Sequence, residues 1–294
     1  KIYQATKRGT SMHKNGKWAT RLIELQDSEG KWGWFHSLSQ FYDSPITTEQ
    51  ALRRLQILGY TAEDDCIQKA LSYMDACLKK EKGIPDRREK LHNWDLFTEM
   101  IVATWVRRFT LDNPLANRVA AQWTDVITAA FSTGSYQHET YLDTYEKVFG
   151  LPARGGRFVD FAGFYRVSLL KDCLDKQTEK AMLDYLLNHE SGIYYIYGSK
   201  LARLPKTFAS KNTSAYLGAM ELLADYTYAR EKLQFVKDWL LTNQNENGKW
   251  DMGKTVNDKL YFPLSDDWRK TATREADCTE RITKLLEKLQ YPNT

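Results

Sequence analysis

The sequence predicts an all-α protein, an α/α toroid of about five outer and inner helical hairpins around a central funnel. Glycines that mark one loop per unit recur at positions 30, 83, 134, 192 and 248, at intervals of 53, 51, 58 and 56 residues. Each lies between two segments of helical periodicity, and the second segment of each pair is apolar over more of its circumference. Period-two alternation, which is typical of strands, is confined to 193–197.

The five units fill one domain, 1–294, and lie near 12–59, 62–109, 113–172, 174–227 and 229–291. We expect outer helices at 18–25, 64–80, 114–131, 176–187 and 231–241, and inner helices at 46–58, 91–109, 158–170, 208–226 and 270–289. Gly59 ends the first inner helix as a C-cap, and Pro114 opens the third outer helix. A longer insertion follows Tyr136 in the third unit.

Composition excludes several classes of function. Lys and Arg (42) and Asp and Glu (38) are interspersed, and the net charge of +4 does not suggest a nucleic-acid partner. No apolar run approaches the eighteen residues of a membrane span. Four cysteines lack the spacing of a zinc or redox motif, so we expect free thiols and a cytoplasmic protein. The chain opens at Lys1, which leaves a removed leader possible, and the oligomeric state is not predictable.

Two segments share one motif, a Gln followed four residues later by Gly and six residues later by Trp. Gln26, Gly30 and Trp32 form the first copy, and Gln244–Trp250 is the second. The motif resembles the repeat signature of the squalene cyclase and protein prenyltransferase β-subunit superfamily, which implies an α/α toroid. Locally, Gln and Trp would attach the outer helix to the following loop, and Gly would permit a tight turn.

The chemistry of that superfamily does not transfer to this sequence. Its prenyltransferases hold zinc with an Asp-x-Cys pair and a downstream His, whereas here Asp277 and Cys278 are adjacent and no His follows His189. Its cyclases protonate an alkene with Asp-x-Asp-Asp, whereas here the first Asp is replaced by Leu264. We therefore expect neither a metal nor a cofactor.

Candidate catalytic residues lie on the second and fifth inner helices. His92, Asp95 and Glu99 are spaced by three and four residues and share one stripe of an apolar helix. An imidazole with two carboxylates suits general acid–base catalysis. The structural alternative is a set of acidic side chains that offset the positive end of the helix. Asp266 and Asp277 complete the predicted catalytic set.

Candidate substrate-binding residues surround the same helices. Arg274 and Arg281 could bind a carboxylate or phosphate in a bidentate manner, and Trp94, Asp267 and Trp268 accompany them. A structural role is an equal alternative for this cluster, since Asp277 and Arg281 have the spacing of a helical ion pair. Asp266 or Asp267 is also a candidate N-cap.

The predicted function is binding of a small molecule in a polar, acid-lined funnel, with enzymatic activity on that molecule. Isoprenoid chemistry of the cyclase or prenyltransferase type is one alternative, supported only by resemblance of fold. A non-catalytic scaffold that binds a protein is another. A cavity of about 300 Å³ or more would favour internal binding over the scaffold.

Overall fold

The computed structural model describes residues 13–36, 45–90, 92–155 and 160–290, and within them the chain is helical without a strand. This confirms the all-α class. The helices are α1 (Lys17–Glu24), α2 (Thr48–Ile57), α3 (Asp65–Leu78), α4 (Trp94–Arg107), α5 (Pro114–Ala130), α6 (His138–Phe149), α8 (Phe164–Leu169), α9 (Lys176–Asn188), α10 (Lys211–Leu223), α11 (Ala229–Lys232), α12 (Gln234–Thr242) and α13 (Thr271–Gln290). A short 3-10 turn, Lys254–Val256, precedes α13.

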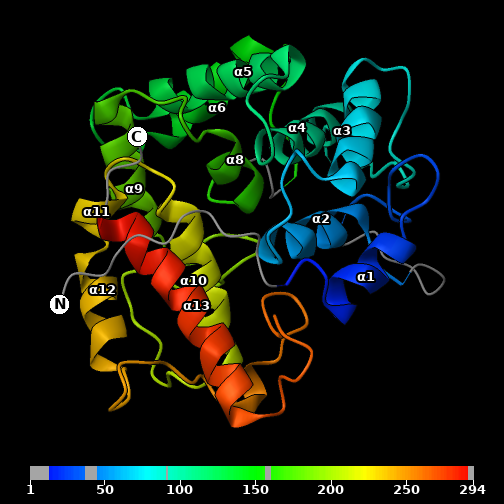
Figure 1. The fold of residues 1–294 in the computed structure, drawn as a ribbon. Coiled ribbons are helices and arrows are strands. Elements are labelled where there is room, and N and C mark those ends of the chain that lie inside the picture. The colour runs from blue at the N-terminus through cyan, green and yellow to red at the C-terminus, as the bar shows by residue number, and fades with distance from the viewer. Residues whose placement is uncertain (1–12, 37–44, 91, 156–159, 291–294) are drawn as a thin grey trace.

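Peripheral and central helices alternate along the chain. In Figure 1, α1, α3, α5, α9 and α12 lie at the periphery, and α2, α4, α8, α10 and α13 lie toward the middle. Helix α4 packs against α3, α5 and α8, so a central helix touches peripheral and central neighbours at once. Each of these five peripheral helices precedes one of the five central helices along the chain.

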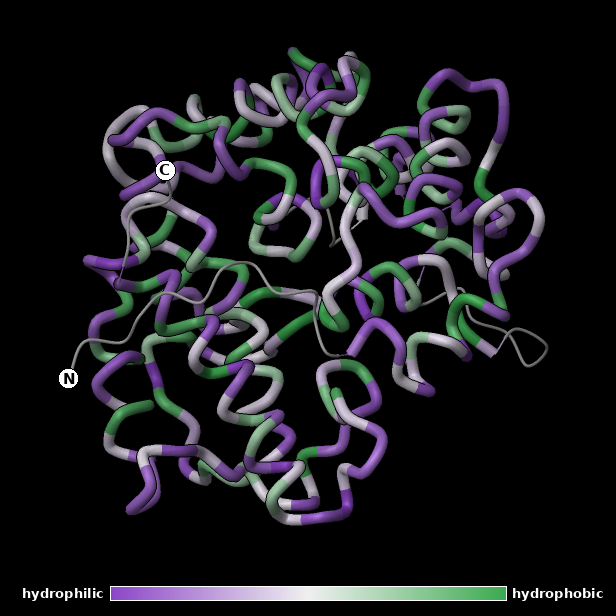
Figure 2. Tube along the Cα trace, viewed as in Figure 1, coloured by the Kyte–Doolittle hydropathy of each residue, from purple (hydrophilic) through white to green (hydrophobic). Residues whose placement is uncertain are grey.

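Burial distinguishes the two kinds of helix. Nine of the fourteen residues of α4 are buried, against two of eight in α1, so α4 is covered on most of its faces. The buried hydrophobic residues form one contiguous cluster. Figure 2 shows that peripheral connections, such as the one between α3 and α4, are largely hydrophilic.

The first motif copy ties α1 to the loop that follows it. Gln26 donates from Nε2 to the carbonyl of Gly30 at 2.9 Å. Trp32 is fully buried, and its indole N–H donates to the carbonyl of Leu22 at 2.6 Å. That carbonyl belongs to the last turn of α1 and also accepts a hydrogen bond from the backbone amide of Leu25 at 3.2 Å.

The second copy repeats these hydrogen bonds. Gln244 donates to the carbonyl of Gly248 at 3.1 Å, and the indole of Trp250 donates to the carbonyl of Leu240 at 2.7 Å. The local role predicted for Gln and Trp is therefore observed in both copies.

The marker glycines differ in conformation. Four of the five adopt the left-handed region, in which a β-carbon is unfavourable, with φ between 61° and 95°. Gly83 is the exception, and its unit is also the one that lacks the aromatic residue. The left-handed turn and the aromatic residue are therefore both absent from the second unit.

The structure departs from the predicted elements in four places. The inner helix expected at 158–170 is reduced to Phe164–Leu169, since residues 160–163 are not helical. The insertion of the third unit forms α6, which packs against α5 and ends at the left-handed Gly150. The outer helix expected at 231–241 is divided into α11 and α12 at Leu233. Ile193 and Tyr197 form an isolated bridge instead of a strand. The helix starts predicted at Leu91 and Phe158 lie outside the described residues, as do both chain ends.

Candidate functional site

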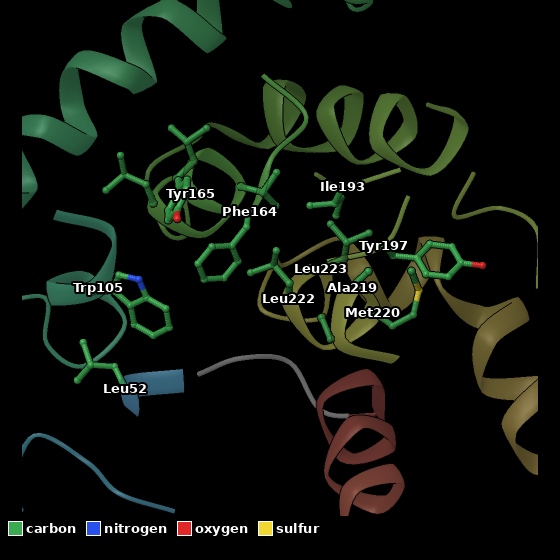
Figure 3. Packing of buried hydrophobic residues seen from close by; sticks show 14 of the residues in the cluster. Leu52, Trp105, Phe164, Tyr165, Ile193, Tyr197, Ala219, Met220, Leu222 and Leu223 are labelled. Atoms are coloured by element: carbon green, nitrogen blue, oxygen red, sulfur yellow. The ribbon is translucent and has the colours of Figure 1, made fainter. Parts of the chain in front are cut away.

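One pocket of about 400 Å³ lies where the C-terminal halves of the central helices meet. All five central helices contribute to its lining, and Tyr261 and Leu264 add to it from the loop before α13. In Figure 3 the side chains of Trp105, Phe164 and Leu222 approach one another from α4, α8 and α10, and the last two line the pocket. Residues far apart in sequence thus line one pocket.

The lining is rich in basic side chains. Seven basic and two acidic residues line the pocket: Arg53, Arg107, Arg108, Lys171, Arg281, Lys284 and Lys288, with Glu221 and Asp225. The expected acid-lined funnel therefore differs in sign from this pocket. Cations near helix C-termini are favoured by the helix dipole, which is one source of this composition.

Most of these basic side chains are already paired. Arg281 donates to Glu221 at 2.6 Å and to Ser214 Oγ at 2.8 Å. The lysines form ion pairs, namely Lys288 with Asp225 at 2.6 Å, Lys284 with Glu280 at 2.6 Å and Lys171 with Asp172 at 3.8 Å. These pairs leave Arg53, Arg107 and Arg108 to be explained.

The guanidinium of Arg107 is engaged by backbone carbonyls. Its guanidinium donates to the carbonyls of Leu169 at 3.1 Å and Lys171 at 2.8 Å, which terminate α8. Arg107 therefore joins α4 to the C-terminal end of α8 and has little donor capacity left for a ligand.

A buried carboxylate holds an aromatic ring that contacts two arginines of the pocket lining. Glu49, in the first turn of α2, is 1% exposed and accepts hydrogen bonds from the Trp105 indole at 2.7 Å and the Tyr165 hydroxyl at 2.8 Å. His36 Nε2 lies 4.0 Å from the same carboxylate. Burial holds the pKa of Tyr165 well above its usual value, so the phenol remains a donor. Glu49 thus orients the Trp105 ring that faces Arg53.

The predicted acid–base stripe does not form one cluster. His92 is hydrogen-bonded to the Glu89 carboxylate. Asp95 is exposed and pairs with Arg88 at 3.0 Å. None of these residues lines the central pocket.

Glu99, the third member of that stripe, lies 3.5 Å from Arg118 of α5. Its partner therefore differs from those of His92 and Asp95. Trp94 is buried and its ring packs against Phe97, 5.8 Å between centroids. Neither Glu99 nor Trp94 lines the pocket.

Asp277 and Asp266 bind backbone. Asp277 is 2% exposed and accepts from the amides of Leu264 at 2.9 Å and Ser265 at 2.8 Å. Asp266 accepts from the amide of Lys17 at 3.0 Å, at the start of α1. The carboxylate predicted as an N-cap of the last helix therefore contacts the first helix.

Arg274, Asp267 and Trp268 also have local partners. Arg274 makes a bidentate pair with Asp251, at 2.7 and 2.6 Å. Asp267 is exposed and pairs with Lys270 at 2.6 Å, and the buried Trp268 ring stacks on Phe262 at 4.9 Å. Among the predicted substrate-binding residues, Arg281 is the one that lines the central pocket.

The structure also bears on the predictions about cysteines, metal ions and membrane spans. All four cysteines are free thiols, and burial raises the pKa of Cys278 to about 12. Within the described ranges, no group of three or more His, Cys, Asp or Glu side chains could hold a metal ion. None of the helices described there is long and apolar enough to cross a membrane.

No family model matches this chain, and neither the curated proteins nor the solved structures include a match to it.

Proposed function

We propose that the five helix pairs form an α/α toroid and that its central pocket binds a small molecule. The observation that carries the proposal is the convergence of five central helices on one pocket of about 400 Å³. Pockets for small ligands begin at about 300 Å³. The matching hydrogen bonds in the two motif copies support the repeat that a toroid requires, in keeping with the resemblance to the squalene cyclase and prenyltransferase superfamily.

The residues that line the pocket help to weigh the two alternatives, an enzyme that acts on an isoprenoid and a protein-binding scaffold. A hydrocarbon substrate would favour aliphatic and aromatic walls, whereas seven basic side chains contribute here. A protein-binding scaffold needs no internal cavity of this size. His92, Asp95 and Glu99 do not line the pocket, so the proposal is limited to binding and assigns no catalytic step.

Filling the pocket tests the proposal. Ile57 lies at the end of α2 in the lining, and Ile57→Trp adds bulk there. Ile23→Trp is the matched control, because Ile23 is 39% exposed on α1. A metabolite library is screened by thermal shift, and binders are titrated by calorimetry. We expect binding to the wild type and to Ile23→Trp, and at least tenfold weaker binding to Ile57→Trp. Equal binding to Ile57→Trp, or a library without binders, refutes the proposal.

A further inference from the structure

Arg53 brings a positive charge to the pocket and has no polar partner among the residues that the structure describes. Its guanidinium lies 4.4 Å from the ring centroid of Phe164 and 5.8 Å from that of Trp105. Arg53 makes no hydrogen bond or ion pair with any residue in the described part of the chain. Ring contacts of this kind contribute about 0.5–2 kcal/mol and leave the donors unused. The five N–H donors of Arg53 are therefore available to a ligand.

Arg108 brings a second cation to the same place. Its donors reach neutral acceptors, Gln56 Oε1 at 3.0 Å and Ser168 Oγ at 3.1 Å. Its guanidinium lies 5.4 Å from the Trp105 ring and 5.5 Å from the Phe164 ring. No carboxylate of the described ranges lies within ion-pair distance of it. Two cations from α2 and α4 thus share one pair of rings.

The proximity of these cations is unfavourable in the empty pocket. Burial lowers the pKa of Arg108 to about 10; Asp225 opposes this shift, and the neighbouring Arg53 adds to it. A negative group between the two guanidiniums would offset both their repulsion and their loss of hydration.

The helix dipole explains only one of the two. Arg108 follows α4 directly as its C-cap, where a cation interacts favourably with the helix end. Arg53 precedes the last turn of α2, and the basic residue of that turn is Arg54. Because the dipole effect falls off within the last turn, a different partner is needed for Arg53.

We infer that the pocket takes an organic oxyanion, with its anionic group bound by Arg53 and Arg108 and its apolar body against the hydrophobic part of the lining. That part comprises Phe164, Val167, Ile196, Leu222, Leu264 and Leu285. Carboxylate and phosphate share the chemistry that this arginine pair recognises. The inference rests on the proposed binding pocket and specifies its ligand class.

Two dyes with the same ring system separate charge from shape. The anion is 8-anilinonaphthalene-1-sulfonate, and the neutral analogue is N-phenyl-1-naphthylamine; both are titrated by fluorescence against the folded protein. The variants are Arg53→Gln, Arg108→Gln, Arg53→Lys and Ile57→Trp. Arg21→Gln on the exposed face of α1 is the matched control. Circular dichroism establishes that each variant is folded.

We expect the anionic dye to bind the wild type at least tenfold more tightly than the neutral dye. Arg53→Gln and Arg108→Gln should each weaken the anionic dye about tenfold or more and change the neutral dye less than twofold. Arg53→Lys should stay within about threefold of the wild type, and Arg21→Gln should match it. Arg53→Gln is the decisive variant if Arg108→Gln does not fold, because Arg53 makes no hydrogen bond to the described chain. Displacement of the dye by benzoate or by phenyl phosphate then identifies the preferred anion.

Failure of the inference is distinguishable from failure of the pocket. Equal affinity for both dyes, unchanged in Arg53→Gln and lost in Ile57→Trp, overturns the anion inference and leaves the pocket standing. Binding that persists in Ile57→Trp, or no binding of either dye, overturns both. Displacement by neither benzoate nor phenyl phosphate also overturns the anion inference.

Discussion

The ring of Tyr261 lies against the backbone of Gly218 in α10. A β-carbon added at Gly218 would be 2.5 Å from Cζ of Tyr261 and closer still to the hydroxyl oxygen. On its other side the ring faces the guanidinium of Arg281, 4.1 Å from the centroid. Because Gly218 has no β-carbon, Tyr261 of the loop before α13 can pack against α10 and line the central pocket.

This contact predicts that Gly218→Ala destabilises the protein, although the same substitution usually stabilises a helix. Alanine in a helix interior is more favourable than glycine by about 1 kcal/mol. Here the methyl group displaces Tyr261, and we expect a net loss of about 1–3 kcal/mol in the free energy of unfolding, measured by urea denaturation. In a Tyr261→Ala background the same substitution should become neutral or stabilising. If Gly218→Ala alone were more stable than the wild type, the predicted clash with Tyr261 would be wrong.

Two marker glycines provide a matched pair. Gly30 has φ of 95°, and a β-carbon there would lie 2.6 Å from the carbonyl carbon of Lys69 in α3. Gly83 has open space and lacks a positive φ. We expect Gly30→Ala to cost about 2–4 kcal/mol and Gly83→Ala to cost nothing or to stabilise by up to about 1 kcal/mol. Chemical denaturation of both variants measures the difference, and equal values would refute the distinction.

The motif tryptophans make a prediction about hydrogen bonding. Trp32→Phe and Trp250→Phe retain an aromatic ring but leave the carbonyls of Leu22 and Leu240 without their indole donor. We expect each to reduce the free energy of unfolding by about 1–3 kcal/mol. Trp239→Phe is the control, since no hydrogen bond of its indole is observed within the described residues. If Trp239→Phe lowered the free energy of unfolding as much as the motif variants do, the decrease would come from ring packing and not from the lost hydrogen bond.

The sequence predicts the framework because helical periodicity and the repeated turn are local. The hydrogen bonds from Gln26 to Gly30 and from the Trp32 indole to Leu22 span four and ten residues, so their pattern is visible in one segment of chain. It does not predict α6, because the helix 138–149 has no counterpart in the other units.

The pocket residues could not be predicted from the sequence, as two Arg-Arg pairs illustrate. In 53–54, Arg54 donates to the carbonyls of Leu260 and Tyr261, while Arg53 faces the pocket. In 107–108, the first arginine binds the end of α8 and the second lies over the aromatic rings. Adjacent helical residues point about 100° apart. Packing against other helices decides which of the two lies over the aromatic rings.

The same distinction applies to the predicted acid–base residues. His92, Asp95 and Glu99 have helical spacing, yet each pairs with a different partner and none lines the pocket. Glu49 does influence the pocket, through Trp105. Its hydrogen-bond partners Trp105 and Tyr165 are 56 and 116 residues away in sequence, so only the fold reveals its role.

The hydrogen bonds that Glu280 accepts from His13 and Lys284 predict a pH dependence of stability. Burial raises the pKa of Glu280, but hydrogen bonds from His13 at 2.8 Å and Lys284 at 2.6 Å outweigh it and lower the pKa from 4.5 to about 2. Because the folded pKa is depressed, the stabilisation is complete above about pH 4.5 and is lost as the pH falls toward 2. After allowance for solvent screening it contributes about 1–2 kcal/mol.

Glu280→Gln should therefore destabilise the protein by this amount at pH 7, and the difference should shrink below pH 4.5. Urea denaturation between pH 2.5 and 7 measures it, with Glu24→Gln on the exposed face of α1 as the control. A loss that is the same at pH 3 and pH 7 would show that Glu280 contributes through packing and not through its charge.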